Sequence, residues 1–136
     1  MSSEAQIHEA VCNYIRLQYP KVLFNSDMSG VRLTKGQAVK AAKLRSSKGF
    51  PDIAIYEPQF MGFAYYGLFL ELKKEGTKLY KKDKTPATKH IQDQQEIIDI
   101  LLKKGYYAAF ACGFDEAKKI IDRYFNGHKN YEILKS

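Results

Sequence analysis

The sequence has few cysteines, no long apolar run and fewer acidic than basic residues. Its two cysteines, Cys12 and Cys112, lie far apart and match no metal-binding spacing, which is typical of buried free thiols in a reducing cytosol. No apolar run approaches the roughly 20 residues of a membrane span. The residues after Met1 lack the basic and apolar regions of a signal peptide. These absences predict a cytoplasmic protein with no membrane partner.

The charge that is present is mostly positive. The chain has 22 Lys and Arg residues against 15 Asp and Glu, a net charge of +7. A basic surplus favours polyanionic partners, nucleic acid first, because cations attract phosphates and release their counterions. The 136 residues are enough for one domain with a real core. We expect that core over about residues 3–125, followed by a C-terminal tail over 126–136.

Two apolar runs of strand length predict the central feature of the fold. They cover about residues 53–56 and 65–72, and the turn-like segment between them is typical of an antiparallel hairpin with a long loop. If the loop is centred near residues 59–64, paired residue numbers sum to about 123, so Asp52 lies opposite Glu71. Lys73 projects from the same face. Both runs are apolar on both faces, which predicts central strands covered by helices on each side.

The predicted end of this hairpin carries a candidate metal site. Directly opposed side chains lie roughly 5 Å apart, and two carboxylates at that spacing suit one divalent cation with oxygen ligands. A lysine beside them suits a phosphate or a metal-bound water. Charged groups at the end of a central strand are costly unless they are paired or coordinated. Asp52, Glu71 and Lys73 are therefore the leading site candidates.

Periodicity and stop signals predict the remaining elements. The expected helices cover Ser3–Tyr19, Gln37–Ser46, Thr88 (or Thr85)–Lys104 and Asp115–Phe125, and the expected extended segments cover Val22–Asn25, Val31–Thr34 and Tyr106–Cys112. This order predicts an α/β domain with a central mixed sheet flanked by helices. The strand after the third helix is expected to join the hairpin's sheet.

Polar side chains on apolar helix faces are further candidates. Glu4 and His8 fall on the apolar side of the first helix, and Gln94 lies in the middle of the apolar face of the third. Glu4 either favours the helix dipole as a first-turn acid or reaches the site from beneath. His8 is interpreted as a satisfied, semi-buried histidine rather than a ligand. Gln94 is either a buried amide bonded to the backbone or a group that orients a water or a phosphate.

Lysines gather on both sides of the hairpin. The segment before it is basic, and the loop at 74–89 is rich in lysine with Tyr80 interleaved. Each segment is interpreted either as a solvated surface or as a set of phosphate contacts, and the loop as a phosphate-backbone clamp in the second case. The candidates for nucleic-acid binding are Lys48, Lys74, Lys78, Lys81 and Lys82.

Several motifs together resemble a known family. Pro51-Asp52, followed after eighteen residues by Glu71-Leu72-Lys73, resembles the PD-(D/E)XK nuclease signature. The resemblance extends to the VRR-NUC group, especially its small stand-alone phage and bacterial members, through the segments Lys48–Ile53, Gly67–Lys74, Thr85–Thr88, Gln94 and Gly105-Tyr106. It covers nearly the whole chain, from the first helix to Tyr124, although the Val-Arg-Arg triplet that gave the group its name is absent.

The resemblance implies a restriction-endonuclease-like core and a metal-dependent endonuclease that hydrolyses DNA in a bacterial or phage-infected cytoplasm. It implies that Asp52 and Glu71, with the Leu72 backbone carbonyl, ligate Mg²⁺ or Mn²⁺. Lys73 would position or help deprotonate the attacking water. Gln94 matches the family's glutamine on the helix after the hairpin, and Glu4 matches a glutamate of the first helix.

Compact dimeric members of the family imply a homodimer that cuts branched DNA. The choice between Holliday junctions, flaps and plain duplex as substrate stays open. No small organic cofactor is expected. Two alternatives stay open at this stage. One is a DNA-binding module that keeps the nuclease fold without cutting, and the other is an interaction protein whose basic loop serves only solubility.

Overall fold

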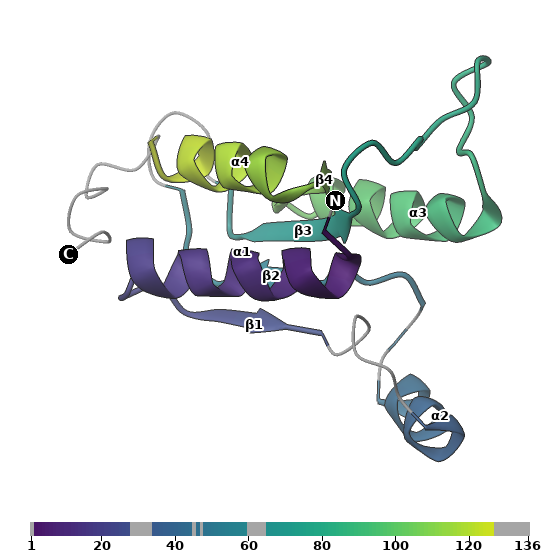
Figure 1. Cartoon of the computed structure of the whole chain (residues 1–136), viewed down its shortest axis with the longest axis horizontal. Helices are drawn as coiled ribbons and strands as arrows, with labels where there is room; N and C mark the ends of the chain where they lie inside the picture. The colour runs from purple at the N-terminus through teal and green to yellow at the C-terminus, as the bar shows by residue number, and fades with distance from the viewer. Residues whose placement is uncertain (1, 28–33, 45, 47, 60–64, 127–136) are drawn as a thin grey trace.

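The computed structural model describes residues 2–27, 34–44, 46, 48–59 and 65–126 (Figure 1). In chain order its elements are α1 (Glu4–Gln18), β1 (Phe24–Ser26), α2 (Lys35–Lys43), β2 (Ile53–Ile55), β3 (Leu68–Lys73), α3 (Lys89–Lys103), β4 (Tyr107–Cys112) and α4 (Phe114–Asn126). The predicted α/β class and element order are confirmed. The expectations for Val31–Thr34 and for the tail lie almost wholly outside the described residues.

The strands form a mixed sheet in the order β1-β2-β3-β4. The first three strands pair antiparallel, whereas β3 and β4 run parallel and are connected through α3. In the hairpin, Ile53 pairs with Leu70 and Ile55 with Leu68. These pairs have the predicted register, so Asp52, which directly precedes β2, comes opposite Glu71.

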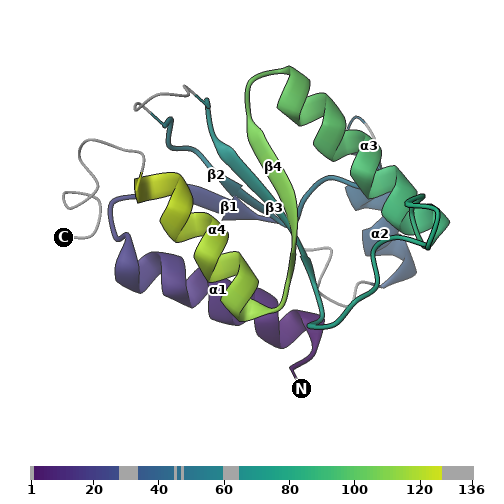
Figure 2. The same ribbon diagram turned by 90° about the horizontal axis from the view of Figure 1, so that it is seen from above.

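Helices cover both faces of this sheet. Figure 2 shows α1 and α4 together on one side of the strands and α3 on the other. The leucines of β3 belong to the core formed with α1 and α4, while Phe69 packs against the core of α3. Because side chains alternate along a strand, Glu71 and Lys73 share the side of Phe69. Within the described part of the chain, no helix has the length and apolar character needed to cross a membrane.

A half-buried carboxylate, Asp122, ties α1 to α4. Oδ1 of Asp122 accepts hydrogen bonds from the hydroxyls of Tyr14 (2.5 Å) and Tyr19 (2.6 Å), and Oδ2 accepts one from Lys118 Nζ (3.0 Å). Burial opposes ionisation of Asp122, but these three donors outweigh it and hold the pKa of the carboxyl below its usual value. The link fixes α1, which carries Glu4, against the rest of the domain.

Local hydrogen bonds explain where two predicted strands differ. The first strand begins at Phe24 rather than Val22, because the Val22 N–H still bonds the Tyr19 carbonyl at the end of α1. The second hairpin strand begins at Leu68 rather than Tyr65, because the Tyr66 N–H bonds Gly105 outside the sheet.

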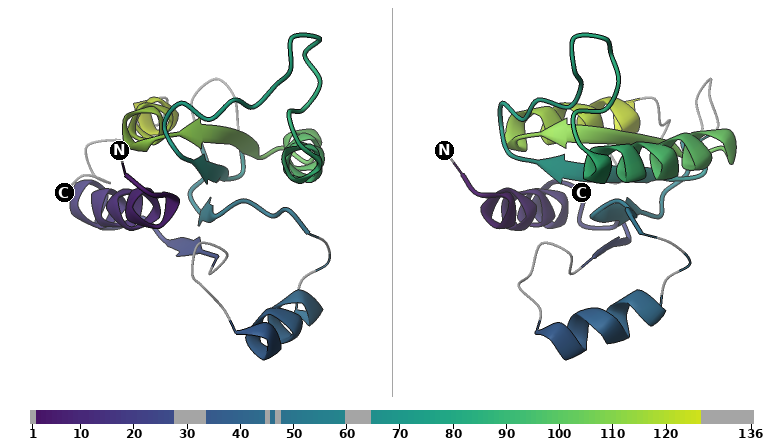
Figure 3. Two further views of the ribbon diagram at one scale, coloured as in Figure 1. Left: turned by 45° about the vertical axis from the view of Figure 1, so that its right-hand side comes forward. Right: turned by 90° about the vertical axis from the view of Figure 1, so that its right-hand side faces the viewer.

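The second helix also differs from its predicted bounds. It covers Lys35–Lys43 rather than Gln37–Ser46. Thr34 is its N-cap, and Thr34 and Gln37 form a reciprocal capping box. The Thr-x-x-Gln pattern is visible in the sequence and would have placed the start correctly. No residue of α2 is buried, so the helix stands away from the main layers (Figures 1 and 3).

Residues 74–88 form a projecting segment that we name the basic arm (Figure 3). Tyr80 and Pro86 make an isolated antiparallel bridge, and the Ala87 N–H bonds the Leu79 carbonyl. Leu79 and Ala87 pack against the core of α3 and anchor the stem. The predicted long loop therefore has internal hydrogen bonds and a fixed attachment.

Candidate active site

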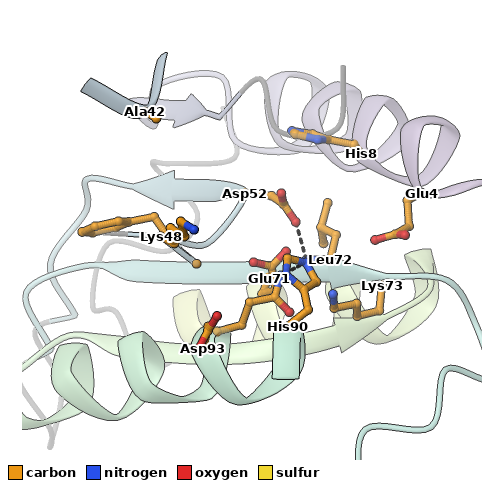
Figure 4. A pocket seen from close by; sticks show the side chains of 13 residues that line it. Glu4, His8, Ala42, Lys48, Asp52, Glu71, Leu72, Lys73, His90 and Asp93 are labelled. Atoms are coloured by element: carbon orange, nitrogen blue, oxygen red, sulfur yellow. Dashed lines mark hydrogen bonds between the residues drawn. The ribbon is translucent and has the colours of Figure 1, made fainter. Parts of the chain in front are cut away.

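A pocket of about 520 Å³ lies at the C-terminal end of β3 (Figure 4). Its lining comes from α1, α2, the loop before β2, β3 and α3. Of the residues singled out from the sequence, the following line it together: Glu4, Lys48, Asp52, Glu71, Leu72, Lys73 and Gln94. The fold thus gathers these seven candidates, which come from four separate parts of the chain, around one cavity.

Asp52 and Glu71 form the floor of the pocket. They are 8% and 4% exposed, respectively. Oδ2 of Asp52 accepts a hydrogen bond of 2.8 Å from the Leu72 backbone N–H, so the β3 backbone itself orients this carboxylate. Two buried carboxylates at opposed sheet positions are costly in isolation, which is a reason to expect a proton or a cation between them.

The electrostatics of the pair follow from this geometry. Burial, a hydrogen bond with Asp52 and the Asp52 charge raise the pKa of Glu71 to about 11, against the lowering effect of Lys73. The charge of Glu4 adds to the rise. At neutral pH, without a cation, the Asp52–Glu71 pair therefore keeps a proton. A divalent cation would replace that proton.

Lys73 is a buried cation, 7% exposed, at the end of β3. Figure 4 shows it on the same side of the pocket as Glu4, whose carboxylate comes from the first turn of α1. Glu4 itself is exposed. It both starts the helix as an acidic first-turn residue and lines the pocket, so the two interpretations of Glu4 are compatible.

Gln94 and His8 each have a buried polar atom that lacks a partner. Among the described residues, Gln94 Oε1 and His8 Nε2 are the buried side-chain atoms without a hydrogen bond, and both residues line the pocket. Buried polar groups are usually paired. The expectation that His8 is satisfied is therefore wrong for Nε2. The bond of Gln94 is to His90, not to the backbone, at 3.2 Å between the two Nε2 atoms.

Gly49 brings the loop before Asp52 against α3. It has φ of +83°, and a Cβ placed there would lie 3.0 Å from the backbone carbonyl oxygen of Asp93 and 3.2 Å from the backbone nitrogen of Gln94. Only glycine combines this backbone conformation with such a close approach. The contact sets the distance between the two walls of the pocket that carry Asp52 and Gln94.

The basic candidates lie at the rim and beyond it. Lys48 is exposed at the pocket wall, while Lys74, Lys78, Lys81 and Lys82 are exposed along the basic arm and do not line the pocket. Tyr80 donates a hydrogen bond of 2.5 Å to Gln95, which attaches the arm to α3. Asp83 accepts from the Thr85 N–H and hydroxyl near the tip. The arm therefore presents its lysines on a defined scaffold.

The donor set fits a hard cation that keeps part of its water shell. Among the described residues, no group of three or more His, Cys, Asp and Glu side chains is arranged to hold a metal ion. Two carboxylates and the Leu72 carbonyl would supply only part of a coordination sphere. Mg²⁺ accepts such sites because it dehydrates reluctantly. Burial and the neighbouring Asp52 oppose a negative charge on Glu71, and a cation between the two carboxylates would offset that cost.

Sequence reasoning missed His90 as a pocket residue. It lies exposed in the first turn of α3, and Figure 4 places it below Leu72. Its spacing of four residues from Gln94 was an available signal, because residues at i and i+4 share a helix face. Phe50 also lines the pocket and packs on the α3 core.

Comparison with known proteins shows a solved structure of similar fold. The sequence matches no family model and no curated protein. A solved structure described as a "VRR_NUC domain protein" superposes on the chain with a TM-score of 0.64 at 25% sequence identity. The alignment covers 94% of this chain and 92% of that one, so the likeness extends over nearly the whole fold.

Proposed function

We propose that this chain, which has the fold of a VRR-NUC domain, is a nuclease that hydrolyses phosphodiester bonds of DNA with the help of Mg²⁺ or Mn²⁺. The observation that carries the proposal is the burial of Asp52, Glu71 and Lys73 around one pocket. Burying three ionisable side chains around one cavity costs stability, so their presence favours a functional role over packing alone.

The metal-binding residues in this proposal are Asp52, Glu71 and the Leu72 carbonyl. When bound, the cation polarises a phosphoryl oxygen and lowers the pKa of a water. Asp52 is preoriented for this task by its hydrogen bond from the Leu72 N–H. Glu71 must give up its proton first, because burial and Asp52 raise its pKa to about 11.

The other pocket residues act on the phosphate and the water. The Lys73 ammonium offsets the charge of the scissile phosphate and holds the nucleophile near it, and its burial strengthens both interactions. Gln94 supplies a hydrogen-bonding group from α3. Glu4 lies at the pocket edge, where it accepts hydrogen bonds from water.

DNA is held by phosphate contacts beyond the pocket. Lys48 flanks the cavity, and the basic arm extends from Lys73 with Lys74, Lys78, Lys81 and Lys82 exposed. A net charge of +7 favours such a partner. The finer part of the proposal is a homodimer that cuts branched DNA such as Holliday junctions. It rests on symmetry, since one pocket serves one strand and a junction needs two incisions.

The test is cleavage of linear duplex, flap and four-way-junction DNA with Mg²⁺, with Mn²⁺ and with EDTA. The wild type is expected to cut with either metal and to be inactive in EDTA. Asp52→Ala, Glu71→Ala and Lys73→Ala are expected to lose cleavage and keep DNA binding. Lys103→Ala, at the far end of α3, is the control.

Three results would count against parts of the proposal. Metal-dependent cleavage that persists in all three variants would show that the activity comes from elsewhere. Binding without any cleavage by the wild type would favour the non-cutting DNA-binding module. Light scattering with and without junction DNA tests the dimer, and a monomer in both conditions would exclude it.

A further inference from the structure

The amide of Gln94 has two ends with different surroundings. Its nitrogen Nε2 lies 3.2 Å from Nε2 of His90, one turn earlier on α3. Its oxygen Oε1 is buried and, among the residues that the structure describes, has no hydrogen-bond partner. Gln94 is 5% exposed and lines the pocket with Asp52, Glu71 and Lys73. The oxygen is therefore the end of the amide left for a molecule in the pocket.

The orientation of the Gln94 amide and the tautomer of His90 depend on each other. An amide nitrogen can only donate, so the ring nitrogen facing it has to accept. A neutral imidazole accepts at one nitrogen and donates at the other, and the observed contact corresponds to His90 with its proton on Nδ1. If the Gln94 amide turned by 180°, its oxygen Oε1 would face the accepting Nε2 of His90, and neither atom could donate a hydrogen bond. The imidazole thus holds the amide in one orientation.

We propose that His90 is a positioning residue that holds the Gln94 amide with its oxygen toward the pocket. Gln94 then accepts a hydrogen bond from the attacking water and does not donate one to the phosphate. The sequence leaves both roles open for this glutamine, and the placement of the amide against His90, with Oε1 unpartnered, favours the first. The inference rests on the proposed nuclease function for its chemical meaning, but the orientation itself does not.

The arrangement suits a nucleophile that must be aligned. A water that donates one hydrogen to a fixed acceptor loses rotational freedom before it attacks, which lowers the entropic part of the barrier. Gln94 takes no proton, since an amide oxygen is a poor base at neutral pH. His90 is exposed, so its ring can be replaced without opening the core.

The first experiment observes the orientation directly and needs no activity. In ¹⁵N-labelled, metal-free protein, the His90 ring nitrogens are expected to show the Nδ1–H tautomer. A through-hydrogen-bond coupling is expected between Gln94 Nε2 and His90 Nε2. A His90 ring protonated on Nε2 at neutral pH would overturn the proposal, because the amide would then turn its oxygen to the ring and its nitrogen to the pocket.

The second experiment replaces His90 by residues of fixed hydrogen-bond character. Glutamate can only accept, so His90→Glu keeps the Gln94 oxygen toward the pocket. Lysine can only donate, so His90→Lys reverses the amide. We expect kcat at saturating DNA to be at least about tenfold higher for His90→Glu than for His90→Lys. Charge alone predicts the opposite order, since a lysine attracts phosphate.

Matched controls remove the remaining charge effect. Gln92 is exposed on the same turn of α3 and bonds Glu96, away from the pocket. Gln92→Glu and Gln92→Lys therefore report what a charge change does to KM and kcat without altering Gln94. Equal kcat for the two His90 variants, or a higher value for His90→Lys, would overturn the proposal. If the wild type cuts no DNA, the nuclease proposal fails, and the tautomer measurement still decides the orientation.

Discussion

Oδ2 of Asp52 accepts a hydrogen bond of 2.8 Å from the backbone N–H of Leu72, 20 positions later in the chain. The bond joins the residue before β2 to the strand that carries Glu71 and Lys73. A side chain of the candidate site is thus also a connection within the sheet. For this reason, changes to the charges in the pocket are expected to alter the stability of the domain as well as its chemistry.

Glu71→Gln is expected to stabilise the metal-free protein increasingly as the pH rises. Burial and Asp52 raise the pKa of Glu71 to about 11 in the fold, far above its unfolded value. Below the pKa that Glu71 has in the unfolded chain, the proton contributes its full stabilisation. As the pH rises from that value toward the pKa that Glu71 has in the folded protein, this stabilisation is lost progressively. The wild type therefore loses up to about 1.4 kcal/mol per pH unit across that window, and glutamine, which does not titrate, loses none.

Urea denaturation in EDTA between pH 5 and pH 9 measures this difference. Glu9→Gln, an exposed carboxylate on α1, is the control and should track the wild type. A gap between Glu71→Gln and the wild type that stays constant as the pH rises would show that Glu71 is already ionised in the fold. Added Mg²⁺ should stabilise the wild type and leave Glu71→Gln nearly unchanged.

Tyr19→Phe is expected to destabilise the protein by about 1.5–3 kcal/mol, the range for a hydrogen bond to a charged group. Its hydroxyl donates to Asp122, whose pKa is held low by Tyr14, Tyr19 and Lys118 against the effect of burial. The lowered pKa of Asp122 stabilises the fold at pH values above the pKa of this carboxyl in the unfolded chain. That stabilisation is lost as the pH falls through the pKa of Asp122 in the folded protein. The cost of Tyr19→Phe, measured by urea denaturation, should therefore shrink in acid.

Tyr66→Phe provides the comparison, since this residue is 65% exposed. It should leave stability within about 0.5 kcal/mol of the wild type. Tyr19→Phe keeps the ring and removes only the hydroxyl, so an equal loss at pH 7 and at pH 3 would mean that the hydrogen bond contributes the same whether or not Asp122 is charged.

The hairpin and the acidic pair could be predicted because they depend on local patterns. Two apolar runs and the turn between them fix the register of the hairpin. Ile53 pairs with Leu70, as expected from the predicted sum of paired residue numbers. Alternation along the strands then brings Asp52, Glu71 and Lys73 to one face. The same logic found Gln94, because a glutamine in the middle of an apolar helix face is visible in the sequence.

Other features depend on contacts between segments that no periodicity records. The approach of Gly49 to the backbone of α3 requires knowledge of where that helix lies. The internal order of the basic arm rests on one bridge and on the attachment of Tyr80 to Gln95, within a stretch whose composition is typical of a loop. His90 carries no signal until the surroundings of Gln94 are known.

Neutralising two lysines of the basic arm is expected to weaken DNA binding in a salt-dependent way. Lys81→Gln with Lys82→Gln removes two exposed charges near the tip of the arm. If both lysines contact phosphates, the slope of the logarithm of the DNA-binding constant against the logarithm of the salt concentration should become less steep by about 1.8. Binding is measured by anisotropy with duplex DNA in EDTA, which prevents cleavage.

Lys103→Gln with Lys104→Gln removes the same charge from the far end of α3. This control separates a specific contact from the loss of net charge. Identical slopes for the two double variants would mean that the arm lysines act only through the net charge of the protein and would exclude the phosphate clamp.

Gly49→Ala is expected to reduce cleavage and stability much more than Gly76→Ala. Both glycines have nearly the same backbone conformation, with φ of +83° and +81°. A Cβ at Gly76 meets nothing within 4 Å, whereas one at Gly49 lies 3.0 Å from the Asp93 carbonyl oxygen. Each alanine carries the strain of a positive φ, about 1 kcal/mol or more, so the difference between them isolates the close approach to α3.

The close approach of Gly49 to α3 is also expected to matter for cleavage in the pocket. The Gly49 alanine has to push α3 and the loop before Asp52 apart, which moves Gln94 away from the carboxylates, and a shift of about 1 Å can cost on the order of 100-fold in rate. Urea denaturation and single-turnover cleavage of duplex DNA measure the two effects side by side. Equal losses of stability in the two variants would show that strain in the loop, and not contact with the helix, is what glycine relieves at Gly49.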